Sequence, residues 1–217
     1  MDIKHNKPHI ILIHGLWMSP LFLLYYYRRL KNLNYNVHLF SYSPTMNSWD
    51  KNLRRLNAFI ENIPHQHVHF IAHSLGGLLI CDYLQKYTPD KKGRAIVLAS
   101  PIAGSSTAKR LSRYYLGRKL LGNAREILCK PRFSAISNWE IASIAGTWGL
   151  GISRILGKLP QPHDGAISVS ETKRAWLTDH LVLPVSHSGI LISSKAASQS
   201  INFIEHGTFH KDKPRYL

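Results

Sequence analysis

The chain has 217 residues and a formal net charge of +16, from 28 lysines and arginines against 12 aspartates and glutamates. This length can bury a core without disulfides or structural metal, and the 44% hydrophobic content excludes an intrinsically disordered protein. Cys81 and Cys129 are the only cysteines, too few for a disulfide scaffold or a cysteine-rich zinc site. The basic excess predicts attraction to nucleic acid, anionic lipid or an acidic partner, without choosing among them.

The N-terminal residues 1–9 lack the apolar stretch of a secretory signal peptide. The nearly uncharged run 10–27 contains His14, Gly15 and Pro20, which would break a membrane-spanning helix. We therefore expect a cytoplasmic protein, and attachment to a membrane face stays open.

Short apolar runs alternate with longer stretches of helical periodicity, a pattern typical of a mostly parallel sheet flanked by helices. In chain order the strands are expected at 9–13, 36–42, 68–72, 94–99, 141–145 and 181–185. Helices are expected at 48–63, 75–87 and 194–205. The first of these helices shows its apolar face clearly, because its large apolar residues recur at spacings of three and four.

Residues 105–138 differ from the rest of the chain in composition. Eight basic residues meet one acid, Glu126, and leucines and tyrosines are interleaved with them. The basic residues are Lys109, Arg110, Arg113, Arg118, Lys119, Arg125, Lys130 and Arg132. We expect one or two basic amphipathic helices here, inserted between two strands as a cap or lid within a single domain, 1–217. The glycine-rich gap between Ala145 and Asp164 is expected to contribute to the same cap.

A nucleophile candidate follows the third predicted strand. The sequence Ala72-His73-Ser74-Leu75-Gly76-Gly77 runs directly into a predicted helix. A strand, a sharp turn and a helix are the context of a nucleophile elbow, in which the backbone holds a serine hydroxyl outward. Small residues are needed two positions before and after the serine, and Ala72 and Gly76 meet that need.

These residues resemble the α/β-hydrolase superfamily, and most of all its small bacterial lipases and esterases. The segment from Ile10 to Gly15 is similar to the strand and His-Gly turn of that family, although Ala72 departs from the usual G-x-S-x-G pattern. The resemblance implies an α/β-hydrolase fold, a mostly parallel central sheet flanked by helices. It also implies that the backbone amides of Leu16 and Leu75 form the oxyanion hole. His14 is interpreted as an architectural residue.

The family order of serine, acid and histidine implies the remaining catalytic residues. His187 follows the last predicted strand and resembles the family's base, whereas His180 lies at the opposite end of that strand. Asp164, in a His-Asp-Gly turn, resembles the family's acid. Asp179 is the alternative, but it precedes the last strand, and catalytic groups gather at the carboxyl ends of strands. The expected triad is therefore Ser74, Asp164 and His187.

Histidines 65, 67 and 69 raise the question of a metal site, because alternate residues of a strand share one face. No cysteine accompanies them, and only Glu61 is close in sequence. We interpret them as solvent-facing residues at the entry to a strand and expect neither a metal nor an organic cofactor.

The sequence thus favours a serine esterase or lipase that cleaves carboxylic esters, lipid-like ones above all, through an acyl-enzyme on Ser74. An acyltransferase or thioesterase with the same triad is one alternative. A non-catalytic membrane- or polyanion-binding homologue is another. The expected partner is a small-molecule or lipid ester. The basic cap could contact an anionic membrane peripherally or could simply be solvated, and the sequence leaves both alternatives open. No nucleic-acid motif is present, so nucleic acid is not expected. The oligomeric state is left open.

Overall fold

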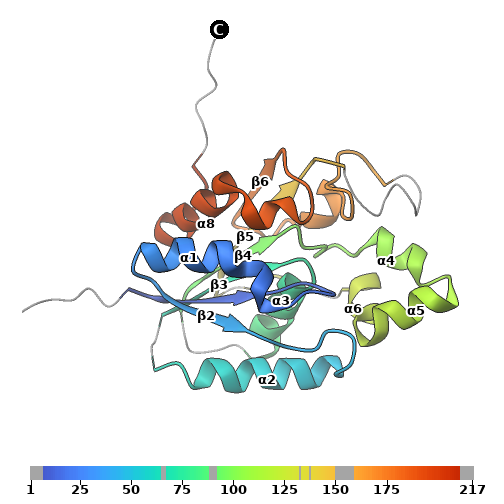
Figure 1. Cartoon of the computed structure of the whole chain (residues 1–217), viewed down its shortest axis with the longest axis horizontal. Helices are drawn as coiled ribbons and strands as arrows, with labels where there is room; N and C mark the ends of the chain where they lie inside the picture. Colours follow the sequence, from blue (N-terminus) through green and yellow to red (C-terminus); the bar gives the residue numbers. More distant parts are fainter. Residues whose placement is uncertain are drawn as a thin grey trace, which may run out of the picture.

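The structure is a computed structural model that describes residues 7–64, 67–87, 92–131, 133–136, 138–149 and 159–210. In this part of the chain, six strands form one sheet in the order β2-β1-β3-β4-β5-β6, and every neighbouring pair is parallel (Figure 1). The strands are β1 (His9–Ile13), β2 (Asn36–Phe40), β3 (Val68–His73), β4 (Arg94–Leu98), β5 (Glu140–Gly146) and β6 (Asp179–Leu183). The predicted parallel central sheet is therefore present.

Helices cover both faces of the sheet. On one face lie α1 (Leu24–Asn32), which follows the 3-10 helix η1 (Pro20–Leu23), and α8 (Ser194–His206); on the other lie α2 (Trp49–Glu61) and α3 (Leu75–Tyr87) (Figure 1). Strand β1 shows how the sequence allows this, because Ile10 and Leu12 join the first layer while Ile11 and Ile13 join the second. A sheet buried on both faces requires such continuous apolar strands.

The edge strand β6 begins and ends two residues earlier than the predicted 181–185. Asp179 and His180 pair with β5, although neither is apolar. The strand is only half-buried, so the apolar pattern does not mark its start. It ends before Pro184, which has no amide hydrogen to continue the ladder.

The segment between β4 and β5 forms three short α-helices where one or two were predicted. They are α4 (Ser106–Leu111), α5 (Tyr115–Leu121) and α6 (Arg125–Cys129), with the 3-10 helix η2 (Gly122–Ala124) between the last two. A side chain at Gly117 would collide with the carbonyl of Leu111, so α4 and α5 approach closely. Gly122, with a φ of +52°, ends α5. We refer to α4–α6 as the cap segment.

The prediction that the histidines at the entry to β3 face solvent is wrong for His69. His69 is buried, and its Nδ1 accepts the amide hydrogen of Arg94 at 3.0 Å. His67 is exposed, and His65 lies outside the described residues. Among the described residues, no group of three or more histidine, cysteine, aspartate or glutamate side chains could hold a metal ion.

Two further observations concern the sequence predictions. Within the described ranges, no helix combines the length and apolar character that a membrane crossing requires. Half of the glycine-rich gap between Ala145 and Asp164, residues 150–158, lies outside the described part of the chain, so its predicted contribution to the cap is not described either.

Candidate active site

Ser74 occupies the sharp turn between β3 and α3. Its φ of 52° lies in the left-handed region, which non-glycine residues adopt at a cost when the surrounding structure imposes it. Its amide donates to the carbonyl of Leu98 on β4 at 2.8 Å. A Cβ at Gly76 would lie 2.6 Å from the carbonyl oxygen of His14, which explains the glycine two residues after the serine. Ala72 is fully buried, so this fold accommodates a methyl group two residues before it.

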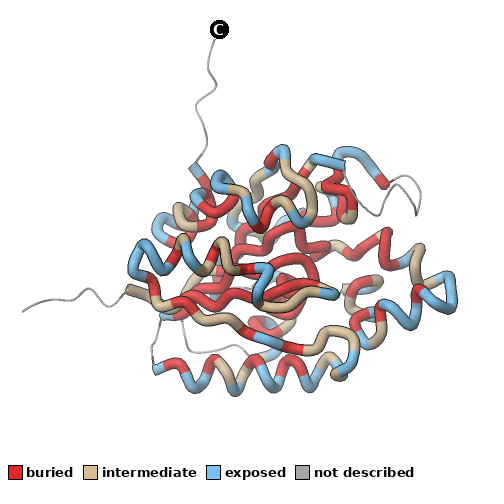
Figure 2. Tube along the Cα trace, viewed as in Figure 1, coloured by how far each residue is buried: buried red, intermediate tan, exposed pale blue. Residues whose placement is uncertain are grey.

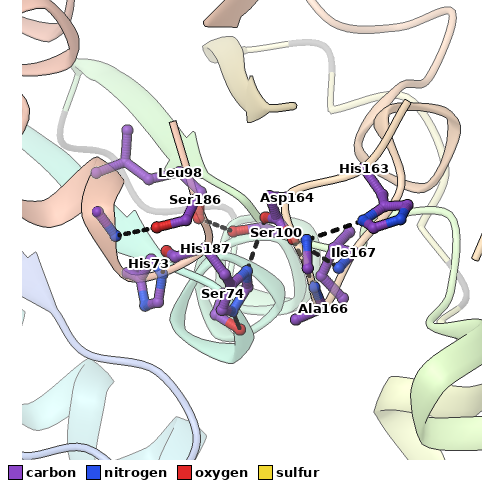
Figure 3. Close-up of polar contacts among 12 residues, drawn as sticks. His73, Ser74, Leu98, Ser100, His163, Asp164, Ala166, Ile167, Ser186 and His187 are labelled. Carbon is purple, nitrogen blue, oxygen red and sulfur yellow. Dashed lines mark hydrogen bonds and ion pairs between the residues drawn. The ribbon is translucent and has the colours of Figure 1, made fainter. Parts of the chain in front are cut away.

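Ser74, His187 and Asp164 form one hydrogen-bonded chain at the carboxyl ends of the strands (Figure 3). His187 Nε2 lies 3.1 Å from Ser74 Oγ, and His187 Nδ1 lies 2.8 Å from Asp164 Oδ2. A carboxylate oxygen can only accept, so Nδ1 carries the proton and Nε2 is free to accept from the serine hydroxyl. In the sequence His187 is 23 positions from Asp164 and 113 positions from Ser74, and the structure brings the three residues together.

Asp164 is held by its own turn. Its side chain is 1% exposed, and Oδ1 accepts the amide hydrogens of Ala166 at 2.9 Å and Ile167 at 2.7 Å. Burial by itself would raise the pKa of the Asp164 carboxyl. The charge and hydrogen bond of His187 and the two amides outweigh burial and hold that pKa below its usual value. The carboxylate therefore stays ionised while it orients His187.

His73 contributes a contact that the sequence reasoning missed. Its Nε2 lies 2.9 Å from the carbonyl oxygen of His187, so it donates to the main chain of the base. Burial, followed by the neighbouring His187, lowers the pKa of His73 to about 3, which keeps the ring neutral. The amide of His187 donates to the carbonyl of Asp164 at 2.9 Å. Both main-chain polar groups of the base are thus fixed. A histidine directly before the serine was the only sequence signal.

The rejected alternatives lie away from this chain of hydrogen bonds. Asp179 accepts the amide hydrogens of His180 and Phe209, and His180 Nε2 lies 3.0 Å from Thr172 Oγ1, all at the amino end of β6. His14 is buried, with Nδ1 2.9 Å from the carbonyl of Gly15. It does not line the pocket beside Ser74, which agrees with an architectural role.

The two residues expected to form the oxyanion hole, Leu16 and Leu75, are both close to Ser74. Leu75 is the first residue of α3, where amides have no partner within the helix and carry partial positive charge. Leu16 lines the same pocket as Ser74 and follows Gly15, where a Cβ would lie 3.0 Å from Ser74 Cβ. Leu16 and Leu75 therefore stay the predicted oxyanion-hole residues.

A pocket of about 440 Å³ opens above Ser74. Four parts of the chain line it: the loop after β1 with η1, the turn at Ser74, the cap segment with the residue before it, and the loops that carry Asp164 and His187. The lining residues are Leu16, Trp17, Met18, Phe22, His73, Ser74, Ser105, Thr107, Ala108, Leu111, Leu121, Leu128, Gly165, Ala166, Ile167, Ser186, His187 and Ser188. Among them only the two histidines are titratable, so the pocket suits an uncharged, largely apolar group.

The buried carboxylate of Glu171, one of the acidic residues considered for the triad, connects the cap segment to the loop that carries Asp164. One oxygen accepts from the amide of Ser106 at the start of α4, and the other accepts from Ser168 at 2.8 Å. Ser168 caps the 3-10 helix η3 (Val169–Thr172), to which Glu171 belongs. Thr107 adds a hydrogen bond to the carbonyl of Ala166 at 2.6 Å.

Comparison with known structures gives the same fold. A lipase of Bacillus licheniformis, BlEst2 in its mature form, is 17% identical, with a TM-score of 0.69, 94% of this chain covered and 95% of that one. The carboxylesterase CesB of Bacillus subtilis is 12% identical, with a TM-score of 0.59 and coverage of 93% and 85%. The phospholipase PlaB of Legionella pneumophila is 16% identical, with a TM-score of 0.59 and coverage of 77% and 46%.

Sequence comparison assigns the family. No curated protein sequence matches this chain, but the family model described as "Alpha/beta hydrolase family" matches residues 10–199. That match spans both the elbow at Ser74 and the two loops that carry Asp164 and His187. The chain belongs to the alpha/beta hydrolase family.

Proposed function

We propose that this protein is a serine hydrolase that cleaves carboxylic esters with an apolar, lipid-like acyl group. One observation carries the proposal. The hydrogen-bonded chain of Ser74, His187 and Asp164 lies at the floor of an apolar pocket, beside the first amides of a helix. The solved lipase and esterase structures with this fold are consistent with it.

The acylation step follows from the hydrogen bonds. Ser74 Oγ attacks the ester carbonyl carbon while its proton moves to His187 Nε2. Negative charge develops on the carbonyl oxygen, where the amides of Leu16 and Leu75 would donate to it. His187 then gives the proton to the departing alcohol oxygen, the ester C–O bond breaks, and the acyl group remains on Ser74.

Deacylation repeats the sequence with water. His187 Nε2 takes a proton from a water molecule, whose oxygen attacks the acyl carbon. Collapse of the second tetrahedral intermediate returns the proton to Ser74 Oγ and releases the carboxylic acid. Asp164 keeps its charge throughout and stabilises the imidazolium of His187 in both steps.

The pocket selects the acyl group in this proposal. We assign residues 105–138 to a cap, because Ala108, Leu111 and Leu121 line the pocket together with Met18 of the loop after β1. An alkyl chain buried against these side chains gains about 0.8 kcal/mol for each methylene removed from water. Rates should therefore rise with acyl length until the pocket is filled.

The test combines substrates of graded length with covalent labelling. Hydrolysis of p-nitrophenyl acetate, butyrate, octanoate and palmitate is measured for the natural chain and for Ser74→Ala, which should lower kcat by at least about 10⁴-fold. A fluorophosphonate should modify one peptide, the one that contains Ser74. The exposed-serine variant Ser134→Ala should keep full activity and labelling. Hydrolysis that survives in Ser74→Ala, or labelling at another serine, would contradict the proposal.

A further inference from the structure

Exposed apolar side chains lie at the pocket and next to it. Trp17 and Phe22 line the pocket and are 52% and 55% exposed. Leu116 and Leu120 of α5 are 70% and 54% exposed, and exposed residues run along much of this helix (Figure 2). Trp17 Nε1 donates to the carbonyl of Leu120 at 3.0 Å, so the two segments are in contact.

We name this surface the entrance patch and define it by five residues: Trp17, Leu21, Phe22, Leu116 and Leu120. Leu116 and Leu120 stand four residues apart and share one face of α5. The residues come from segments about 100 positions apart in sequence, yet Trp17 contacts Leu120, and Trp17 and Phe22 also line the pocket. Exposed apolar groups gathered around a pocket mark an interaction site rather than ordinary scattered surface residues.

Basic side chains accompany the entrance patch. Six of the cap segment's lysines and arginines are exposed, and in the described part of the chain none of the six forms an ion pair with a carboxylate. They are Lys109, Arg113, Arg118, Lys119, Arg125 and Lys130. At about 100° per residue, Lys119 stands beside Leu116 and Leu120 on the outward side of α5, opposite the buried Gly117. Its Nζ lies 4.7 Å from the ring centre of Tyr115, which is also exposed.

The combination of the two features selects the partner. A nucleic acid would satisfy the charges through its phosphates but would leave the leucines in water. A bilayer with anionic headgroups meets both needs, because phosphates pair with lysine and arginine while leucine and tryptophan enter the boundary between headgroups and acyl chains.

We propose that the entrance patch and the basic residues of the cap segment dock this protein on an anionic phospholipid membrane, with the pocket opening toward the lipid. That an ester enters the pocket from the membrane rests on the proposed function. The docking itself does not, because it depends on none of the three catalytic residues.

The primary experiment measures membrane binding without turnover. The full chain carrying Ser74→Ala is sedimented with vesicles of phosphatidylcholine alone and with vesicles of equal parts phosphatidylcholine and phosphatidylglycerol. Binding to the mixed vesicles should be at least tenfold tighter. It should weaken as salt is raised from about 0.1 M to about 1 M, where the screening length falls from about 10 Å to about 3 Å. Equal binding to both vesicles, or binding to neither, overturns the proposal.

Charge variants separate a defined surface from net charge. In the Ser74→Ala background, Arg113→Gln with Lys119→Gln should weaken binding to mixed vesicles about 25-fold, about fivefold for each charge. The control, Lys31→Gln with Lys92→Gln, removes the same charge at the opposite end of the sheet, where both residues are exposed. It should change binding less than threefold. Equal loss in the two pairs would mean that the overall charge binds the lipid, and the proposed surface would be wrong.

Apolar variants separate a membrane from other polyanions. Leu116→Ser with Leu120→Ser should weaken vesicle binding about tenfold or more. Leu33→Ser, an exposed leucine after α1, is the control and should bind normally. No effect of the paired change, together with displacement of the protein from vesicles by a single-stranded oligonucleotide, would indicate polyanion binding and overturn the membrane proposal.

The two proposals fail in different ways. If vesicle binding is absent while p-nitrophenyl esters are cleaved at Ser74, only the docking falls. If vesicles bind as expected and no ester is cleaved, only the proposed function falls. The variants at Lys119 and Leu116 lie outside the pocket, so the same changes in the active chain should leave hydrolysis of the soluble acetate ester unchanged and show that they fold.

Discussion

Asp164→Asn should disable the proposed catalytic chain by changing the tautomer of His187. Asp164 Oδ1 accepts the amide hydrogens of Ala166 and Ile167, and only an oxygen can accept them. The asparagine oxygen must therefore take that place, which puts its NH₂ group where Oδ2 now lies, 2.8 Å from His187 Nδ1. An NH₂ group donates, so Nδ1 must become the acceptor and the ring proton must move to Nε2. Nε2 can then no longer accept the proton of Ser74.

The magnitude follows from this geometry. A wrong histidine tautomer in a Ser-His-Asp triad lowers kcat by about 10⁴-fold, equivalent to about 5.5 kcal/mol of transition-state stabilisation. The reverse orientation of the asparagine would restore the tautomer but would set its NH₂ group against two buried N–H donors. Leaving such donors unsatisfied costs about 1–3 kcal/mol each, so the catalytically useful orientation is disfavoured.

The assay measures kcat and KM for the best p-nitrophenyl ester. We expect kcat to fall by about 10⁴-fold and KM to change by less than about threefold, because the pocket wall is unchanged. Asp179→Asn is the control. Asp179 accepts main-chain amides at the far end of β6, so its replacement should leave kcat intact. A loss below tenfold for Asp164→Asn, or an equal loss for Asp179→Asn, would refute the reasoning.

Three further predictions concern packing, pH and the position of the base. Gly76→Ala should destabilise the fold by about 1–3 kcal/mol in thermal unfolding, because its methyl group meets strand backbone, whereas Ala72→Gly should cost about 1 kcal/mol or less. Burial, aided by neighbouring positive charge, lowers the pKa of His69 to about 4 from its ordinary 6.5. The stability that this neutral ring contributes is complete above pH 6.5 and is lost as pH falls toward 4. This group changes the free energy of unfolding by up to about 1.4 kcal/mol per pH unit. In urea unfolding measured at several pH values, His69→Asn should remove this contribution. A pH dependence that stays unchanged in the variant would contradict the assignment. His73→Phe should lower kcat about tenfold, because the carbonyl of His187 loses its hydrogen-bond donor. His73→Gln can place an amide donor where His73 Nε2 now lies and should recover most of the lost kcat. Equal loss in both variants would argue that His73 contributes packing alone.

The strands could be located from the sequence because the sheet is covered on both faces. A central strand such as β1 is then a nearly continuous apolar run, which the sequence pattern marks clearly. The edge strand β6 carries polar and half-exposed residues, so its boundaries follow hydrogen bonds to β5 that the sequence does not reveal. The cap helices were misjudged for a related reason. Their number depends on the close approach at Gly117, a tertiary contact.

The turn at Ser74 could be predicted because its residues are consecutive in the sequence, and a strand followed by small residues around a serine and then a helix indicates a nucleophile elbow. Asp164 and His187 came from resemblance to a family, since no local pattern joins residues 23 positions apart. The supports of the site could not be found this way. His73 meets the main chain of His187 across 114 positions, and Glu171 meets Ser106 across 65. Such pairs involve ordinary polar residues whose importance depends entirely on the partner that folding provides.

The position of the basic charge now follows from the chemistry of the site. Asp164 is ionised in an apolar environment, and its charge is balanced by two amides and by His187 alone. A lysine or arginine in the pocket would compete with His187 for that carboxylate and would break the path of the proton to Ser74. The described residues that line the pocket include no lysine or arginine, and the basic residues of the cap segment lie on its outer surface. The basic residues kept out of the proposed catalytic site are therefore available to the anionic membrane proposed above.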